Sequence, residues 1–308
     1  MAIRLGFQIP NFSYGTGIDQ LFPTVIAQAR EAESAGFDSV FVMDHFYQLP
    51  MLGTPDQPML EAYSALAALA TATERVQLGT LVTGNTYRNP TLLAKTITTL
   101  DVISQGRAIL GIGTGWFELE HDQLGFDFGT FTDRFNRLDE ALQIILPMLK
   151  GERPTFSGTY YRAGEALANP RYRDHIPLMI GGSGEKKTIP LAARHFDHLN
   201  LIAGFDELPR KLRVVQQQCE KIGRDPATLE TSVLITALLD ENVKPDVVPA
   251  EMSQRMVVGS ADSIADQIKT KVIDAGIDSV IVNMPFYTPG VITAAGEALR
   301  PLVGLQVG

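Results

Sequence analysis

Short apolar segments rich in β-branched and aromatic residues alternate along the chain with longer segments of helical periodicity. This alternation is typical of a parallel sheet in which crossover helices join successive strands. Eight strand candidates are each followed by a helix-like segment, and they cover residues 3–9, 37–43, 75–82, 107–113, 177–181, 198–202, 231–238 and 278–283. This count predicts an α/β fold of the (β/α)8 TIM-barrel type.

The length of 308 residues suits one barrel with insertions, and no low-complexity segment or Gly/Ser linker marks a boundary. We therefore expect a single domain over residues 1–308. Hydrophobic residues make up 45% of the chain and charged residues 20%, which is typical of a globular protein with a substantial core.

The formal net charge of -9, without a run of Lys or Arg, argues against nucleic acid as a partner and favours a small-molecule substrate. The sequence begins without a basic region followed by an apolar segment. No apolar stretch approaches the roughly 20 residues of a membrane span. We expect a cytoplasmic protein that does not bind membranes. Cys219 is the only cysteine and reads as an ordinary helix thiol.

Four connecting segments are longer than plain barrel loops need, namely residues 46–60, 116–132, 151–176 and 240–258. Long ordered loops of this kind are usually functional, and we expect lids or walls over a pocket. Residues 156–161 have the alternation and the glycine of a small hairpin. Gly36 and Gly276 each stand where a helix gives way to a strand, which predicts a left-handed backbone conformation at both.

The pair Asp44-His45 directly follows the second strand candidate. In a β/α barrel the carboxyl ends of the strands form the catalytic face, and an imidazole exchanges a proton near neutral pH. We therefore predict that His45 is catalytic and that Asp44 biases its tautomer or binds a cofactor. A structural histidine that caps a loop is the alternative. The other histidines lack a metal-ligand spacing, so no metal site is predicted.

Glycines are concentrated where the fourth strand candidate ends, in Gly111-Ile112-Gly113-Thr114-Gly115-Trp116. No glycine opens a helix after them, which argues against a Rossmann dinucleotide site. Two interpretations are equally open. The glycines let a flat ring approach the backbone while Trp116 closes one side, or they form a tight turn with a packed indole.

The fifth strand candidate ends in Gly181-Gly182-Ser183, and a helix is expected to begin immediately afterwards. Backbone N–H groups and the positive end of the helix dipole would then meet at one point, which suits a phosphate. Lys186 or Lys187 would assist, whereas Glu185 would oppose an anion. The alternative is a flexible turn in which Ser183 is the N-cap.

The third strand candidate ends in a polar loop that would stand beside Asp44-His45. Thr83, Asn85 and Tyr87 are its candidate ligand donors, although ordinary loops use the same residue types. Pro90 then opens a helix in the manner of a proline at the first helical position.

Several of these segments together resemble the bacterial luciferase-like monooxygenase superfamily, and in particular its oxidoreductases that depend on the deazaflavin coenzyme F420. The resemblance covers nearly the whole chain. It rests most specifically on residues 39–46, 76–80, 87–90 with 93–95, 99–107 leading into 111–116, and 134–140.

The resemblance implies a (β/α)8 barrel with insertions, a homodimer, and coenzyme F420 or, as the alternative, FMN. It places the phosphate arm on Gly181-Gly182-Ser183 and the ring near Asp44, Thr114 and Gly115. It also implies a bulge near Leu81-Val82, often with a non-prolyl cis peptide, behind the ring. His45 matches the active-site histidine of the F420-dependent sugar-phosphate and alcohol dehydrogenases.

Two departures from the sugar-phosphate dehydrogenases make that substrate doubtful: Trp116 stands where they have a glutamate, and Leu49 aligns near their tryptophan. The main hypothesis is hydride transfer between C5 of F420 and a small organic substrate, with His45 handling the proton. An FMN-dependent monooxygenase and a non-catalytic barrel that binds a deazaflavin or flavin are the alternatives.

Overall fold

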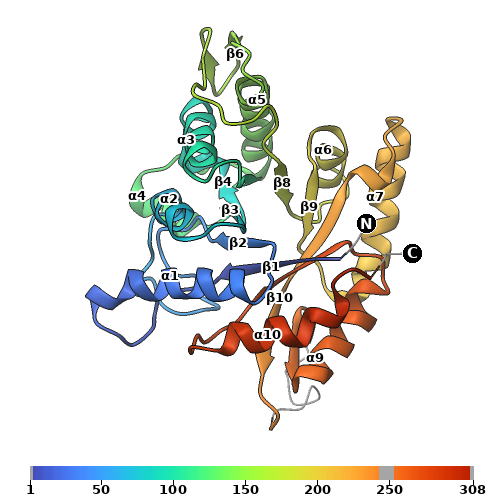
Figure 1. The fold of residues 1–308 in the computed structure, drawn as a ribbon. Helices are drawn as coiled ribbons and strands as arrows, with labels where there is room; N and C mark the ends of the chain where they lie inside the picture. The colour runs from blue at the N-terminus through green and yellow to red at the C-terminus, as the bar shows by residue number, and fades with distance from the viewer. Residues whose placement is uncertain (1–2, 243–252, 306–308) are drawn as a thin grey trace. The chain divides into compact units, whose positions relative to one another are not determined.

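The computed structural model describes residues 3–242 and 253–305 (Figure 1). Its backbone contacts divide the chain into two compact units. Unit 1 comprises Met1–Phe41 and Met179–Gly308, and unit 2 comprises Val42–Leu178. That the chain behaves as a single domain stays a prediction.

Unit 1 is built on buried parallel strands. These are β1 (Arg4–Ile9), β2 (Ser39–Val42, except its last residue), β8 (Leu178–Gly181, except its first), β9 (His198–Leu201), β10 (Glu230–Leu239), β11 (Met256–Gly259) and β12 (Ser279–Asn283). β1 runs parallel to β12, with Arg4 opposite Ser279. β10 runs parallel to β9, β11 and β12, and β8 to β9. The almost continuous burial of β1 and β12 is that of strands covered on both faces.

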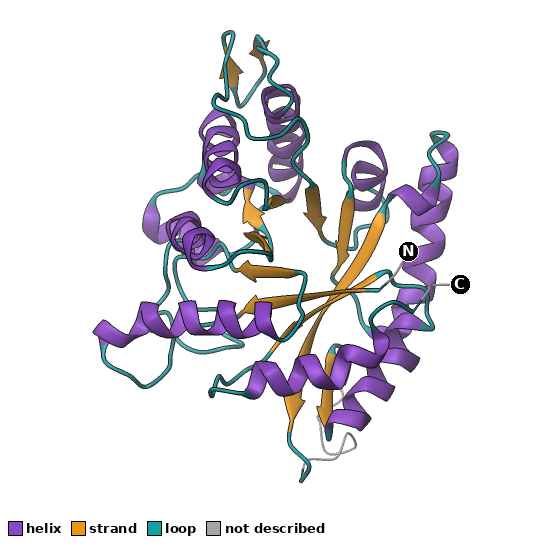
Figure 2. Cartoon of the chain, in the orientation of Figure 1, coloured by secondary structure: helices purple, strands orange, loops and turns teal. Residues whose placement is uncertain are grey.

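Unit 1 also contains helices, which Figure 2 draws in purple, with the strands in orange. They are α1 (Ile18–Ser34), α6 (Thr188–His195), α7 (Leu208–Lys221), α9 (Ala261–Ile268) and α10 (Val291–Leu299), with short turns η2 (Phe205–Glu207), η3 (Pro226–Thr228), η5 (Lys269–Ile273, a π-helical turn) and η6 (Arg300–Leu302). α1 buries a stripe that includes Leu21, Val25 and Ala29. Gly36 and Gly276 have φ of 92° and 101°, which confirms the predicted left-handed conformation.

Unit 2 contains β3 (Gln77–Thr80), β4 (Thr83–Gly84) and β5 (Ala108–Gly113). Both β3 and β4 run parallel to β5, so Leu81-Val82 interrupts what would otherwise be one strand. The peptide bond between these two residues is cis, as the resemblance implies. A Cβ on Gly111 would lie 2.1 Å from the carbonyl oxygen of Thr80. Glycine is therefore needed there for the backbones to approach.

The helices of unit 2 are α2 (Ala62–Ala72), η1 (Asn85–Tyr87), α3 (Pro90–Ile103), α4 (Glu118–Leu124) and α5 (Phe131–Leu149). Pro90 is the first residue of α3, as predicted, and the side chain of Asn89 caps the helix by accepting from the N–H of Thr91. A hairpin follows α5, in which β6 (Phe156–Ser157) pairs antiparallel with β7 (Arg162–Ala163). It confirms the hairpin expected in the segment 151–176.

Each of the eight strand candidates overlaps an observed strand, namely β1, β2, β3, β5, β8, β9, β10 and β12. The predicted fold class, a (β/α)8 barrel with insertions, is confirmed. The sequence did not predict β4, β11 or α4. The segment 116–132 holds α4, and the segment 240–258 lies partly outside the described residues.

Candidate active site

His45 lies three residues beyond the end of β2 and belongs to unit 2. Its Nδ1 is 2.9 Å from Oε2 of Glu120. The imidazole meets the rings of Trp116 and Phe117 edge to face, with centroids 5.6 and 5.8 Å away. Since only 12% of the side chain is exposed, the ring is held between one carboxylate and two aromatic groups.

Glu120 lies in the first turn of α4, and its side chain has no exposed surface. Oε1 accepts hydrogen bonds from the N–H groups of Phe46 (2.5 Å) and Tyr47 (2.9 Å). Oε2 accepts from the hydroxyl of Tyr87 in addition to its contact with His45. Burial acts to raise the pKa of Glu120, but the hydrogen bonds and charge of His45 and the donors Tyr87 and Tyr47 together lower it below its ordinary value. The carboxyl is therefore ionised at neutral pH.

Asp44 is also buried, but it has different partners. Its Oδ2 and Oδ1 accept from the two Nη atoms of Arg88 at 2.7 and 2.9 Å, and Oδ2 also accepts from the N–H of Gly84 at 3.1 Å. Arg88 also binds Glu61. Burial raises the pKa of Asp44 while Arg88 opposes the rise, and the bidentate geometry is that of an ion pair.

The acid that contacts His45 is therefore Glu120, whereas the sequence assigned the control of its tautomer to Asp44. The structure corrects that assignment, because both oxygens of Asp44 accept hydrogen bonds from Arg88 and Gly84 instead. A cofactor contact by Asp44 stays a prediction. The sequence did not indicate Glu120, because no helix was predicted in the segment 116–132 and its contacts with His45, Phe46 and Tyr47 are made only in the folded chain.

The polar loop after β3 is mostly engaged within unit 2. The hydroxyl of Thr83 is 2.5 Å from that of Tyr63 and 2.7 Å from that of Thr80. Asn85 is buried, and its Nδ2 donates to the hydroxyl of Tyr161 at 3.4 Å. Its Oδ1 has no hydrogen-bond partner among the described residues. A buried carbonyl without a donor is costly, which makes Oδ1 an available acceptor for a bound ligand.

The glycine-rich stretch after β5 has a structural explanation. Gly115 has φ +80°, and a Cβ there would lie 2.5 Å from Oγ1 of Thr86. Its carbonyl accepts from Nε of Arg134 and, at 3.4 Å, from the hydroxyl of Thr114. The tight-turn interpretation accounts for the glycine without a ligand. Trp116 is 54% exposed, so its indole is available as a wall.

The turn Gly181-Gly182-Ser183 belongs to unit 1 and begins at the last residue of β8. Gly182 has φ +137°, and its N–H donates to the carbonyl of Asn200 at 2.9 Å. The hydroxyl of Ser183 donates to the carbonyl of Ile202 at 2.7 Å. The N–H of Gly182 is thus already used within the protein and is not one of the backbone donors predicted to meet a phosphate at this turn.

The helix after this turn starts later than predicted. α6 begins at Thr188, and its N-cap is Lys187. The expectation that a helix begins immediately after the strand is therefore wrong, and so is the alternative in which Ser183 is the N-cap. Residues 182–187 separate the strand from the helix and include a turn. Their glycines and lysines do not show from sequence whether such a turn belongs to the helix.

Lys211 of α7 supplies a cation at this turn that the sequence did not indicate. The residue is largely buried, and its Nζ donates to the carbonyl of Ser183 at 3.1 Å and to Oε1 of Glu185 at 2.9 Å. Arg210 lies 3.1 Å from the same carboxylate. Because Glu185 is paired with two cations, its opposition to a nearby anion is weaker than its charge alone suggests.

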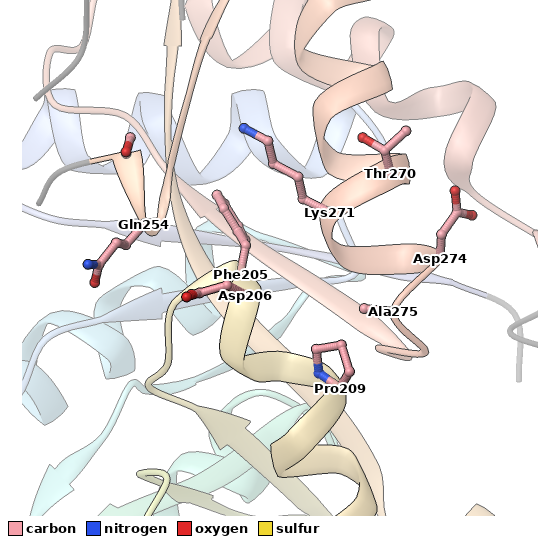
Figure 3. A pocket seen from close by; sticks show the side chains of 9 residues that line it. Phe205, Asp206, Pro209, Gln254, Thr270, Lys271, Asp274 and Ala275 are labelled. Carbon is pink, nitrogen blue, oxygen red and sulfur yellow. The ribbon is translucent and has the colours of Figure 1, made fainter. Parts of the chain in front are cut away.

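A separate hollow of about 600 Å³ lies elsewhere in unit 1 (Figure 3). Its lining includes Phe205, Asp206 and Gln254 on one side and Thr270, Lys271 and Asp274 on the other. The ammonium of Lys271 lies 5.4 Å from the centre of the Phe205 ring. None of the predicted site residues lines it, so it is not the candidate active site.

Among the described ranges, no cluster of three His, Cys, Asp or Glu side chains is arranged to hold a metal ion. Within the same ranges no helix combines the length and apolar character needed to cross a membrane.

The family profile of luciferase-like monooxygenases matches residues 3–245. The F420-dependent glucose-6-phosphate dehydrogenase of Microbacterium testaceum is 36% identical over 231 residues, which is 74% of this chain and 61% of that protein. The F420-dependent hydroxymycolic acid dehydrogenase of Mycobacterium tuberculosis is 29% identical over 279 residues, or 89% of this chain and 75% of that protein. The match thus spans less than two thirds of the Microbacterium protein.

Among solved structures, an F420-dependent secondary alcohol dehydrogenase, crystallised with an F420-acetone adduct, superposes with a TM-score of 0.84. The superposition covers 98% of this chain and 99% of that one at 21% identity. At this level of identity the similarity shows a shared fold.

Proposed function

Because the chain belongs to the luciferase-like monooxygenase family, we propose that it is a coenzyme F420-dependent oxidoreductase. In this proposal a hydride passes between C5 of the deazaflavin and a small organic substrate. The similar proteins whose names include F420 support the choice of cofactor. The observation that carries the chemistry is the contact between His45 and the buried Glu120, because it provides a proton-exchanging group with an oriented ring.

The chain contains groups suited to a deazaflavin ring. Deazaflavins and flavins both carry a ring N–H between two carbonyls, and the buried Oδ1 of Asn85 is an acceptor without a partner among the described residues. Asn85 would hold the ring together with Asp44, Leu81, Val82 and Thr83, and with Thr114, Gly115 and Trp116. Gly181, Gly182 and Ser183 would contact the phosphate arm, with Lys211 as a further cation.

F420, when bound, supplies the group that accepts or gives the hydride. The residues of the chain would position the substrate and handle its proton. His45 would take the hydroxyl proton of an alcohol as its carbon loses the hydride, or return it to the carbonyl oxygen in the reverse direction.

We propose a small neutral alcohol or carbonyl compound as substrate rather than a sugar phosphate. Trp116 replaces the glutamate expected of the sugar-phosphate dehydrogenases, and its half-exposed indole lies beside His45. Leu49 is buried in an apolar cluster with Met43 and Phe117. Within unit 2 these residues offer apolar contacts and no charge that would bind a phosphate.

Titration of the purified protein with F420 and with FMN, followed by turnover at the deazaflavin absorbance band, tests the proposal. We expect tighter binding of F420, and turnover with short secondary alcohols or ketones in preference to glucose 6-phosphate. Preferential binding of FMN with consumption of oxygen would instead support a monooxygenase, the activity in the family's name.

The non-catalytic alternative would bind F420 tightly and fail to change its absorbance with any compound in the panel.

We also propose that the protein is a homodimer and acts in the cytoplasm, as expected for the family. Light scattering at several protein concentrations tests the dimer.

A further inference from the structure

We infer that Glu120 is a positioning residue that keeps Nδ1 of His45 protonated and turns Nε2 toward the substrate. The inference rests on the proposed function, because it assigns the nitrogen through which His45 would exchange its proton. It is carried by the hydrogen bonds of Glu120 and by the packing of the imidazole.

The carboxylate of Glu120 is saturated with donors. A carboxylate has two oxygens with about four lone-pair positions. Phe46 and Tyr47 supply two backbone donors to Oε1, and Tyr87 supplies a hydroxyl to Oε2. His45 is the fourth partner, at 2.9 Å from Oε2. A proton on Glu120 would displace one of these donors, so the group remains an acceptor.

The tautomer of His45 follows from this saturation. An ionised carboxylate has no hydrogen to give, so the hydrogen in the 2.9 Å contact belongs to Nδ1 of His45. In the neutral ring Nε2 then carries the lone pair. Nε2 is the nitrogen that can take a proton, while Glu120 stabilises the resulting imidazolium.

The residues on both sides of His45 are fixed as well. The N–H groups of Phe46 and Tyr47 bind Glu120, and on the other side Asp44 binds Arg88. The side chain cannot turn its ring over without losing the contact with Oε2 and the packing on Trp116 and Phe117. The orientation is therefore set before a substrate arrives.

The charged and titratable groups around the imidazole are few within unit 2. Glu120 contacts it directly, and Tyr87 shares the same oxygen. Asp44 is neutralised by Arg88. His121, beside Glu120 in α4, binds Thr86 and the carbonyl of Phe117, and burial lowers its pKa below its ordinary value. Glu120 is thus the carboxylate that contacts the imidazole directly.

The proton balance of the step is simple. In alcohol oxidation F420, when bound, would accept the hydride with its two electrons from the alcohol carbon, and the hydroxyl would lose its proton to Nε2 of His45. The products would be a carbonyl compound, the anion of reduced F420 and an imidazolium. In reduction each transfer is reversed, so Nε2 supplies the proton to the carbonyl oxygen.

The first test is the tautomer in the unmodified protein, measured by nitrogen–proton NMR after labelling of its five histidines. The His45 signal is assigned by its absence in His45→Gln. We expect Nδ1 protonated and Nε2 unprotonated in the neutral ring. A neutral ring with its hydrogen on Nε2 would overturn the inference, whether or not the protein uses F420.

The second test compares Glu120→Gln with the wild type and with Glu118→Gln, an exposed neighbour in the same helical turn. With an alcohol that the wild type oxidises, we expect kcat to fall about 30-fold or more in Glu120→Gln, with F420 affinity changed by less than about threefold. The pH profile of kcat should also change, because the imidazolium that forms during turnover loses its carboxylate partner.

The outcomes of the two hypotheses separate. A wild type that binds no F420 refutes the proposed function and leaves the NMR result to decide on Glu120. A wild type that turns over F420, together with a folded Glu120→Gln of unchanged kcat and pH profile, refutes the role of Glu120 alone. If Glu120→Gln does not fold, the tautomer of the wild type decides. Glu118→Gln should behave as the wild type throughout.

Discussion

Unit 2 has two buried carboxylates near the imidazole of His45. Asp44 precedes it in the sequence and Glu120 contacts it in space, and the two carboxylates bind different kinds of partner. Asp44 binds a guanidinium, which stays charged at every working pH. Glu120 binds two backbone N–H groups, a phenol and an imidazole. The first arrangement is a buried ion pair and suits a scaffold. The second includes an imidazole, which can take up or give a proton, and suits proton exchange.

The largest expected effect is on stability, from removing the cation of the first arrangement. Arg88→Leu should lower the free energy of unfolding by about 3–5 kcal/mol, because Asp44 would remain buried without its partner. Urea denaturation at neutral pH measures this. Lys269→Met is the matched control, since Lys269 and Asp274 form a pair of which about half is exposed, and it should cost less than about 1 kcal/mol.

A double variant sharpens the interpretation of that result. Asp44→Leu with Arg88→Leu removes both charges and should recover part of the stability lost in Arg88→Leu alone. If the double variant loses as much stability as the two single variants added together, Asp44 is not left unpaired by Arg88→Leu. The proposed difference between the Asp44–Arg88 pair and the Glu120–His45 pair would then be wrong.

Removing the imidazole affects turnover instead. His45→Ala should lower kcat about 100-fold or more, equivalent to about 2.7 kcal/mol in the barrier, because the substrate loses its proton partner. F420 affinity should change little. Steady-state kinetics and F420 titration give the two values, with the exposed His175→Ala as the control. A comparable loss of affinity and turnover would contradict a proton-handling role for His45.

The second carboxylate also has a stability effect that depends on pH. The folded pKa of Glu120 is lowered, so its stabilisation is present above the unfolded value of about 4.3 and is lost as the pH falls through the folded pKa. At pH 7 Glu120→Gln should cost about 2 kcal/mol. Urea denaturation from pH 7 down to pH 3 should show this difference narrowing below about pH 4. A constant difference would mean that the charge of Glu120 contributes nothing.

The strands were predictable because their signal is local. Segments such as 37–43 and 278–283 are apolar and β-branched over the length of a strand, and each is preceded by a glycine in the left-handed region. β4 was not predictable, because its two residues, Thr83 and Gly84, are too few to show the alternation of a strand. The start of α6 depends on where a turn ends, which the residues 184–187 do not reveal.

The candidate site divides in the same way. His45 and Trp116 could be predicted as site residues because each stands shortly after the end of a strand. The structure brings their rings into contact. Glu120 lies 75 residues from His45 in sequence, and its role depends on tertiary contacts with Phe46, Tyr47 and Tyr87. No local pattern indicates that a helical glutamate is buried. The catalytic and cofactor assignments themselves stay predictions.

The smallest effect is expected from trimming one donor of the reactive carboxylate. Burial and the hydrogen bond to Glu120 raise the pKa of Tyr87 above its ordinary value, so the phenol remains a donor at working pH. Tyr87→Phe removes that donor and leaves His45 bound to the same oxygen. We expect about 1 kcal/mol lower stability and less than a fivefold change in kcat, measured by urea denaturation and steady-state kinetics. Tyr172→Phe, at an exposed position, is the control. A loss of kcat as large as that of His45→Ala would mean that the phenol, and not the imidazole, is the essential partner of Glu120.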